Sequence, residues 1–132
     1  MSTTTTTAED SDVPVPVNKS RVMTLLCRHT GTVIDECSPV IPDSSFELEA
    51  TAQGVYHVRW RFNAQAIELI SIVTSDSSLH TDKLVVAAFS ELAKEAGLRL
   101  IVVRVLSERS TYWKKLGFTP CDAPPGAYAK AL

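Results

Sequence analysis

The sequence predicts an α+β protein, with mixed α/β layers, in which a mixed sheet of about six or seven strands packs with one long and one short helix. Residues 66–74 and 99–106 are almost entirely apolar, as strands covered on both faces are. The segment between them repeats apolar residues at helical spacing over about residues 81–96. A strand, a crossover helix and a strand of these lengths form a right-handed unit with a parallel strand pair.

Length and composition are those of one globular domain. The chain has 132 residues, of which 45% are hydrophobic and 21% charged. A chain of this length and composition can bury a core without disulfides or bound metals. A net charge of −2 gives no basic footprint for nucleic acid. No apolar run approaches the roughly 20 residues that a membrane span needs. The N-terminus lacks the basic and apolar regions of a secretory signal, so we expect a cytoplasmic protein. The oligomeric state stays open.

Two regions differ in composition. Residues 1–18 are threonine-rich, then acidic, then alternate valine with proline. Such a segment cannot bury enough surface to offset its ordering entropy, so we predict a disordered tail. Residues 19–132 are predicted to form a single domain. Its three cysteines form no C-x-x-C motif and are expected to be free thiols, and their spacing to the histidines matches no common zinc site.

The first half of the domain is predicted to form antiparallel strands. Residues 21–27 and 32–37 are predicted to form two strands joined at Gly31. Residues 46–51 and 55–62 follow, with the apolar and polar alternation of half-buried strands. The stretch at about residues 28–45 is short, contains prolines and lacks helical periodicity.

The second half contains the two predicted helices. Thr81 is a candidate N-cap of the long helix, and Gly97 can adopt the left-handed conformation that ends it. A short helix follows, with Trp113 and Leu116 on one face. Residues 127–132 are predicted to return as an edge strand.

The order of elements over residues 66–118 carries a resemblance. Together with the ending Tyr112-Trp113-Lys114-Lys115-Leu116-Gly117-Phe118, it resembles the C-terminal half of the GNAT family of acetyl-CoA-dependent N-acetyltransferases. That family places two helices after its first strand, and here these front helices would be missing or replaced. The resemblance implies a GNAT-like sheet that opens beside the loop between residues 74 and 81.

The residues that this family uses for chemistry are altered. Its pyrophosphate loop brings glycines to the start of the long helix, where backbone N–H groups bind the anion. The matching stretch here, residues 77–83, has no glycine and contains Asp82. Trp113 stands where the family has a proton-donating tyrosine, Tyr112 lies one residue earlier, and Leu106 stands at the position of a CoA-contacting asparagine. The resemblance therefore implies a degenerate acetyl-CoA site.

Two functions are compatible with this pattern. In the first, the protein binds and modulates a protein partner, as small phage-encoded proteins that redirect host enzymes do. The surface expected to carry this role comprises Asp76, His80, Lys83, Tyr112, Trp113 and Lys114.

The alternative is an acetyl-CoA-dependent N-acetyltransferase with an atypical pyrophosphate loop. Acetyl-CoA or CoA would be the cofactor, Tyr112 or water would supply the proton, and Glu68 would be the general base. The cofactor would be held by Ile72, Val73 and Thr74 along the strand and by His80, Thr81 and Lys83 at the helix start. A third reading is an α/β domain unrelated to this family, which strands that stay paired along residues 66–74 and 99–106 would favour.

Overall fold

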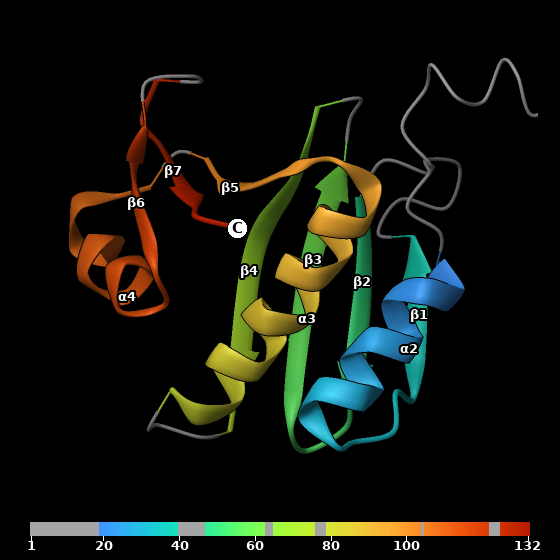
Figure 1. Cartoon of the computed structure of the whole chain (residues 1–132). Helices are drawn as coiled ribbons and strands as arrows, with labels where there is room; N and C mark the ends of the chain where they lie inside the picture. The colour runs from blue at the N-terminus through green and yellow to red at the C-terminus, as the bar shows by residue number, and fades with distance from the viewer. Residues whose placement is uncertain (1–18, 40–46, 63–64, 76–78, 104, 122–124) are drawn as a thin grey trace, which may run out of the picture.

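The computed structural model describes residues 19–39, 47–62, 65–75, 79–103, 105–121 and 125–132 (Figure 1). These residues form one seven-stranded sheet in the order β1-β2-β3-β4-β5-β7-β6. The predicted mixed α+β class is confirmed. In chain order the elements are α2 (Lys19–Thr30), β1 (Glu36–Pro39), β2 (Glu47–Ala52), β3 (Tyr56–Phe62), β4 (Ala66–Thr74), α3 (His80–Ala96), β5 (Arg99–Val102), the 3₁₀ turn η1 (Ser107–Arg109), α4 (Ser110–Lys115), β6 (Phe118–Cys121) and β7 (Ala127–Lys130).

The central strands agree with the sequence prediction. β4 has the predicted bounds, β2 is shifted by one residue toward the C-terminus, and β3 begins one residue later than predicted. Neighbouring strands run antiparallel except for β4 and β5, which form the predicted parallel pair. Gly97 has a φ of 70°, and its N–H donates to Ala93 O, so it ends α3 as expected.

β4 and β5 separate after a short pairing. Residues 66–69 of β4 pair with residues 99–102 of β5, where β5 ends, whereas β4 continues to Thr74. β5 is therefore shorter than the predicted strand at 99–106. The opening expected of a GNAT-like sheet is present, and the continuous pairing that would favour an unrelated α/β domain is absent from these two described strands.

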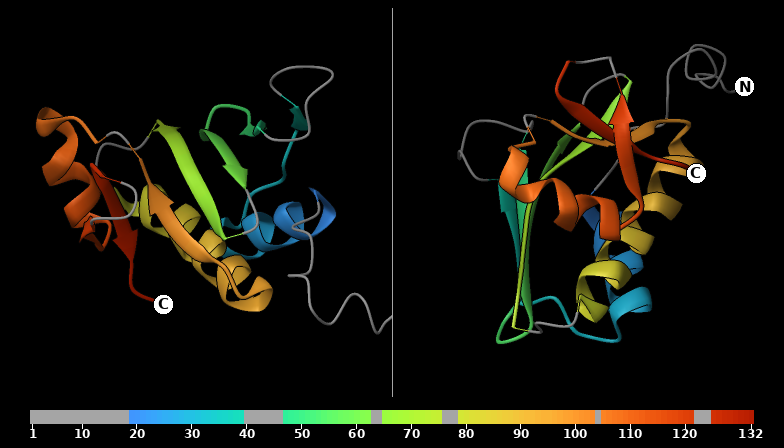
Figure 2. Two further views of the ribbon diagram at one scale, coloured as in Figure 1. Left: turned by 90° about the horizontal axis from the view of Figure 1, so that it is seen from above. Right: turned by 90° about the vertical axis from the view of Figure 1, so that its left-hand side faces the viewer.

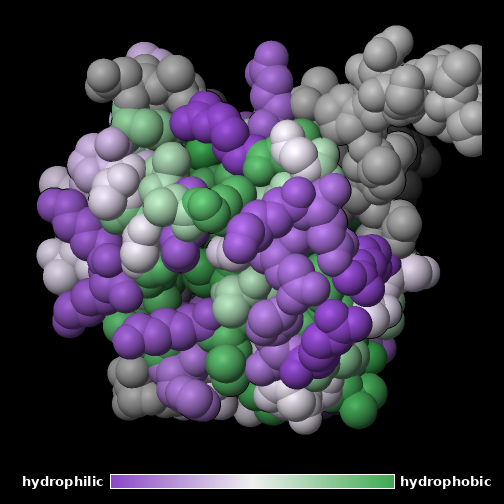
Figure 3. Space-filling model, viewed as in Figure 1, coloured by the Kyte–Doolittle hydropathy of each residue, from purple (hydrophilic) through white to green (hydrophobic). Residues whose placement is uncertain are grey.

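Two helices cover one face of the sheet. α2 and α3 lie side by side on that face, whereas α4 lies apart from them beside β6 (Figure 2). Their inward surfaces are apolar, and the Phe89 ring of α3 packs on Trp60 of β3 at a centroid distance of 5.2 Å. Polar side chains cover the outer surface of both helices (Figure 3). The opposite sheet face carries cross-strand ion pairs between Glu47 and Arg59 and between Arg61 and Glu68.

The prediction of a strand at residues 21–27 is wrong, because these residues belong to α2. Val22, Leu25 and Leu26 are buried at a spacing of three and four residues, which forms one helical stripe against the core. Packing on α3 and the sheet decides this conformation over local strand propensity. A helix, α2, therefore precedes β1, in addition to the one long and one short helix that the sequence predicted. The strand predicted at 32–37 begins only at Glu36.

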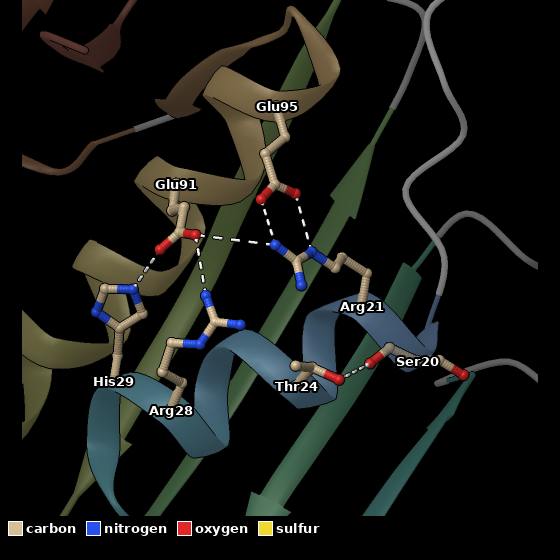
Figure 4. Close-up of polar contacts among 7 residues, drawn as sticks. All are labelled: Ser20, Arg21, Thr24, Arg28, His29, Glu91 and Glu95. Carbon is tan, nitrogen blue, oxygen red and sulfur yellow. Dashed lines mark hydrogen bonds and ion pairs between the residues drawn. The ribbon is translucent and has the colours of Figure 1, made fainter.

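Ion pairs between the two covering helices line their outer seam (Figure 4). Arg21 Nε donates to Glu95 at 2.9 Å, Arg28 Nη1 lies 3.3 Å from Glu91, and His29 Nε2 lies 2.8 Å from the other oxygen of Glu91. All five side chains are partly or largely exposed. Exposed pairs add little stability, so the apolar stripe holds α2 in place and the pairs fix its orientation.

The C-terminal strands depart from the prediction. Residues 127–132 were expected at the edge, but β7 lies inside the sheet, between β5 and β6. The strand at this edge of the sheet is β6, which was not predicted as a strand because prolines lie in and after it. Pro120 has no backbone N–H to donate, and an edge strand tolerates that loss. Phe118 at the start of β6 is fully buried and anchors the strand on the core.

Other expectations concern the chain as a whole. The three cysteines are free, as predicted. Among the described residues, no three metal-ligating side chains gather. None of the helices in the described part of the chain is both long and apolar enough to cross a bilayer. The predicted tail at residues 1–18 and Asp76 lie outside the described residues.

The buried stripe of α2 makes a testable prediction. Leu25→Ala should lower the free energy of unfolding by about 2–5 kcal/mol, because it leaves a cavity at a residue that is 1% exposed. Thr24→Ala, at the neighbouring exposed position, is the matched control and should change stability little. Urea unfolding followed by circular dichroism measures both. Equal effects of the two substitutions would contradict the helical packing.

Candidate functional site

A cavity of about 240 Å³ lies where β4 and β5 separate. Its walls come from the middle of β4, the end of β5 and the segment that leads into α4. Most of the lining residues are apolar, and Ser71 and Arg109 contribute one hydroxyl and one guanidinium group. The lining residues are Leu69, Ile70, Ser71, Val102, Val103, Val105, Leu106, Arg109 and Trp113.

A β-bulge marks the point of separation. Trp60 of β3 pairs with Leu69, but the preceding residue, Arg59, pairs with Ser71, so Ile70 is an extra residue on β4. A bulge bends its strand and increases the local twist. This distortion begins immediately after Leu69, the last residue of β4 that pairs with β5. The bulge and the cavity therefore share a common position on β4.

The backbone of β4 beyond the bulge presents alternate N–H groups to the opening. The Ser75 N–H donates to Val55 O at 3.0 Å, toward β3. Since amides alternate in direction along a strand, the Val73 N–H also points toward β3. The N–H groups of Ile72 and Thr74 point the other way, toward the opening. Of the three strand residues predicted to hold a cofactor, Ile72 and Thr74 thus direct their backbone N–H groups toward the opening, and Val73 does not.

The start of α3 differs from the prediction at its cap. The helix begins at His80, and the residue at the cap position is Leu79, in the left-handed conformation with a φ of 67° and without a side-chain cap. Thr81 is therefore inside the helix, and its assignment as N-cap is wrong. His80 and Lys83 are exposed here, whereas Thr81 is half-buried. An anion approaching this helix end would meet His80 and Lys83.

Asp82, in the first turn of α3, is turned into the protein and is only 3% exposed. Its carboxylate accepts a hydrogen bond from Thr74 Oγ1 at 3.0 Å and another from the Tyr112 hydroxyl at 2.5 Å. A buried carboxylate needs such donors, because burial removes its water. The positive end of the helix dipole stabilises it further. Asp82 thus connects the end of β4, the start of α3 and α4.

Tyr112 is held in a position that keeps its proton. Burial raises the pKa of its hydroxyl, and the hydrogen bond to the Asp82 carboxylate raises that pKa further. The guanidinium of Arg109 lies 4.2 Å from the centre of the Tyr112 ring. A phenol with a raised pKa whose proton is already donated to a carboxylate is a weaker general acid than a free tyrosine.

Trp113, the residue after Tyr112, packs in the hydrophobic core. Trp113 is 6% exposed and meets the Phe118 ring edge-on at 5.5 Å. Trp113 and Leu116 are both buried, as their predicted shared face requires. Of the predicted partner surface, His80, Lys83 and Lys114 are exposed, whereas Trp113 contributes only to the cavity wall.

Glu68, the predicted general base, lies on the opposite face of the sheet from α3, since its neighbours Ile67 and Leu69 are buried under the helices. Arg61 Nε donates to it at 2.6 Å. Tyr112 instead contacts Asp82, so the two predicted catalytic residues take part in separate interactions.

Sequence reasoning missed the inward orientation of Asp82 and the position of Arg109 at the cavity. A signal for Asp82 was present, because it precedes the buried residues Val85 and Val86 by three and four positions. That spacing places Asp82 on the buried stripe of the helix. The position of Arg109 at the cavity has no such signal, since it depends on where the segment that leads into α4 packs against β4 and β5.

Comparison with known proteins gives a limited result. No protein-family model matches the chain, and no curated protein sequence matches it. One similar solved structure is the PaiA N-acetyltransferase from Thermoplasma acidophilum in complex with coenzyme A, with 18% sequence identity and a TM-score of 0.45. The match covers 65% of this chain and 60% of that protein. A similarity this partial carries no argument about activity or ligand.

The contact between Tyr112 and Asp82 makes a second prediction. Tyr112→Phe should lower the free energy of unfolding at neutral pH by about 1–3 kcal/mol, because the buried carboxylate loses a donor. Above pH 10 the unfolded tyrosine ionises, while the raised pKa keeps the folded one protonated, so wild-type stability should fall with rising pH. The variant should lose that part of the alkaline slope.

Tyr128→Phe is the control, since the Tyr128 hydroxyl makes no hydrogen bond with another described residue. Urea unfolding at a series of pH values between 7 and 11 measures both variants. Identical neutral stabilities and alkaline slopes for the two variants would show that the contact with Asp82 contributes nothing.

Proposed function

We propose that this protein is a GNAT-like domain that does not transfer acetyl groups and that acts by binding and modulating another protein. The observation that carries the proposal is the hydrogen bond from Tyr112 to the buried Asp82 carboxylate. This hydrogen bond engages the only tyrosine of the short helix. The Asp82 carboxylate that accepts it puts a negative charge in the helix turn where a pyrophosphate would bind. Both effects oppose acetyl-CoA chemistry.

The partner surface in this proposal is the exposed edge formed by the start of α3 and by α4. His80, Lys83 and Lys114 are exposed there. Lys83 and Lys114 have no carboxylate within ion-pair distance among the described residues. Uncompensated lysines favour an acidic surface on the partner and steer its approach.

A second candidate function is acetyl-CoA-dependent N-acetyl transfer with an atypical pyrophosphate loop. The opening between β4 and β5 favours it, because the Ile72 and Thr74 amides point into the gap that a pantetheine arm would fill. The proton for the leaving thiolate would then come from water or from Tyr112, after the contact with Asp82 is broken.

Calorimetric titration with acetyl-CoA and with CoA separates the two candidates. A non-catalytic domain should show no heat of binding at millimolar cofactor and no release of thiol with a panel of amines. Micromolar binding together with thiol release that falls in Tyr112→Phe would overturn the proposal and establish the acetyltransferase.

Affinity capture from cells of the source organism tests the partner surface. The immobilised wild-type protein should retain a specific protein that the Lys83→Glu/Lys114→Glu variant loses, because the variant reverses the charge of the surface. Lys94→Glu, at the exposed far end of α3, is the matched charge-reversal control and should retain the partner. Equal capture by both variants would exclude this surface.

A further inference from the structure

We propose that the cavity between β4 and β5 binds a small apolar carboxylate, such as a medium-chain fatty acid, with its chain inside the cavity and its carboxylate on Arg109. This binding site does not depend on the partner proposal, since it uses the cavity and not the lysine surface. It concerns a free ligand rather than acetyl-CoA.

The cavity lining favours an alkyl chain. Seven of its nine lining residues are apolar, and three of these, Leu69, Val102 and Trp113, belong to the hydrophobic core. The volume of about 240 Å³ is below the range common for drug-sized ligands. A methylene group fills roughly the volume of a water molecule, ~30 Å³, so the cavity accommodates a chain of about eight carbons. A nucleotide does not fit this space.

The entrance of the cavity favours an acid. Arg109 is exposed at the rim and has no carboxylate within ion-pair distance among the residues that the structure describes. Its guanidinium is oriented by the ring of Tyr112, at 4.2 Å. A guanidinium held in this way loses less side-chain freedom when it binds a carboxylate in its two-pronged geometry. The hydroxyl of Ser71, which also lines the cavity, is a further donor.

The rim next to Arg109 extends the apolar surface. Leu106 lines the cavity and is 60% exposed, so it adds apolar surface at the entrance. An alkyl chain entering beside Arg109 would cover part of this side chain. The arrangement of a cation at the mouth and apolar walls inside is therefore complementary to an amphipathic acid, with the polar end outward.

Titration of the full-length protein with octanoate, by calorimetry, tests this inference. Octanoate should bind at roughly millimolar or lower concentration, as expected for about ten non-hydrogen atoms. Octan-1-ol, which keeps the chain and lacks the charge, should bind on the order of 10-fold more weakly, because it forms no charge-assisted hydrogen bond. Butanoate should bind more weakly than octanoate, since it leaves most of the cavity unfilled.

Variants identify the two ends of the ligand. Arg109→Gln should weaken octanoate on the order of 10-fold and leave octan-1-ol unchanged. Lys115→Gln removes an exposed cation at the end of α4 that does not line the cavity, so it should alter neither. Ser71→Leu, which fills the cavity, should abolish binding of both compounds. Thermal melts verify that each variant folds.

Absence of octanoate binding at 10 mM to wild-type protein would overturn the inference. Equal affinities for octanoate and octan-1-ol, or equal effects of the two cation variants, would overturn the assignment of Arg109. None of these results changes the expectations for CoA titration or partner capture, so failure of this inference is distinguishable from failure of the proposed function.

Discussion

The buried carboxylate of Asp82 is the constraint on which the open end of this molecule depends. It lies where three elements meet, and it accepts hydrogen bonds from Thr74 on β4 and Tyr112 on α4. A charged group that is 3% exposed requires these donors, so the strand end and the short helix are held at fixed positions against α3. The same contact sets the orientation of Tyr112 and, through its ring, that of Arg109.

The opening of the sheet follows from the same region of the fold. Two adjacent parallel strands ordinarily remain paired, because each separated pair leaves backbone groups to be satisfied elsewhere. Here the bulge at Ile70 turns β4 away where β5 ends, and α4 packs over the gap through Trp113. The result is a small apolar cavity with a cation at its mouth, together with strand amides that point into the gap.

The open sheet favours ligand binding, and the contact between Tyr112 and Asp82 disfavours acetyl transfer. The open sheet and the Ile72 amide suit a linear ligand, whereas the engaged Tyr112 proton and the buried Asp82 charge oppose acetyl transfer. In the function that we propose, the lysines at the start of α3 and on α4 supply charge for a protein partner. The cavity between β4 and β5 is the proposed site for a smaller ligand.

The sequence by itself determined the central unit of the fold. The apolar runs of β4 and β5, the helical stripe of α3 and the glycine that ends it are local patterns, and local patterns follow directly from backbone periodicity. The tertiary structure decided the rest. α2 is helical because Val22, Leu25 and Leu26 can be buried together on α3, and β6 lies at the edge because only there is Pro120 tolerated. The helical spacing indicates that Asp82 faces the core, but its partner Tyr112 lies 30 positions away in sequence. The position of Arg109 at the cavity depends on β4 and β5, which are also distant from it in sequence. No local pattern encodes these pairings, because they arise only when α3 and α4 pack beside the opened sheet.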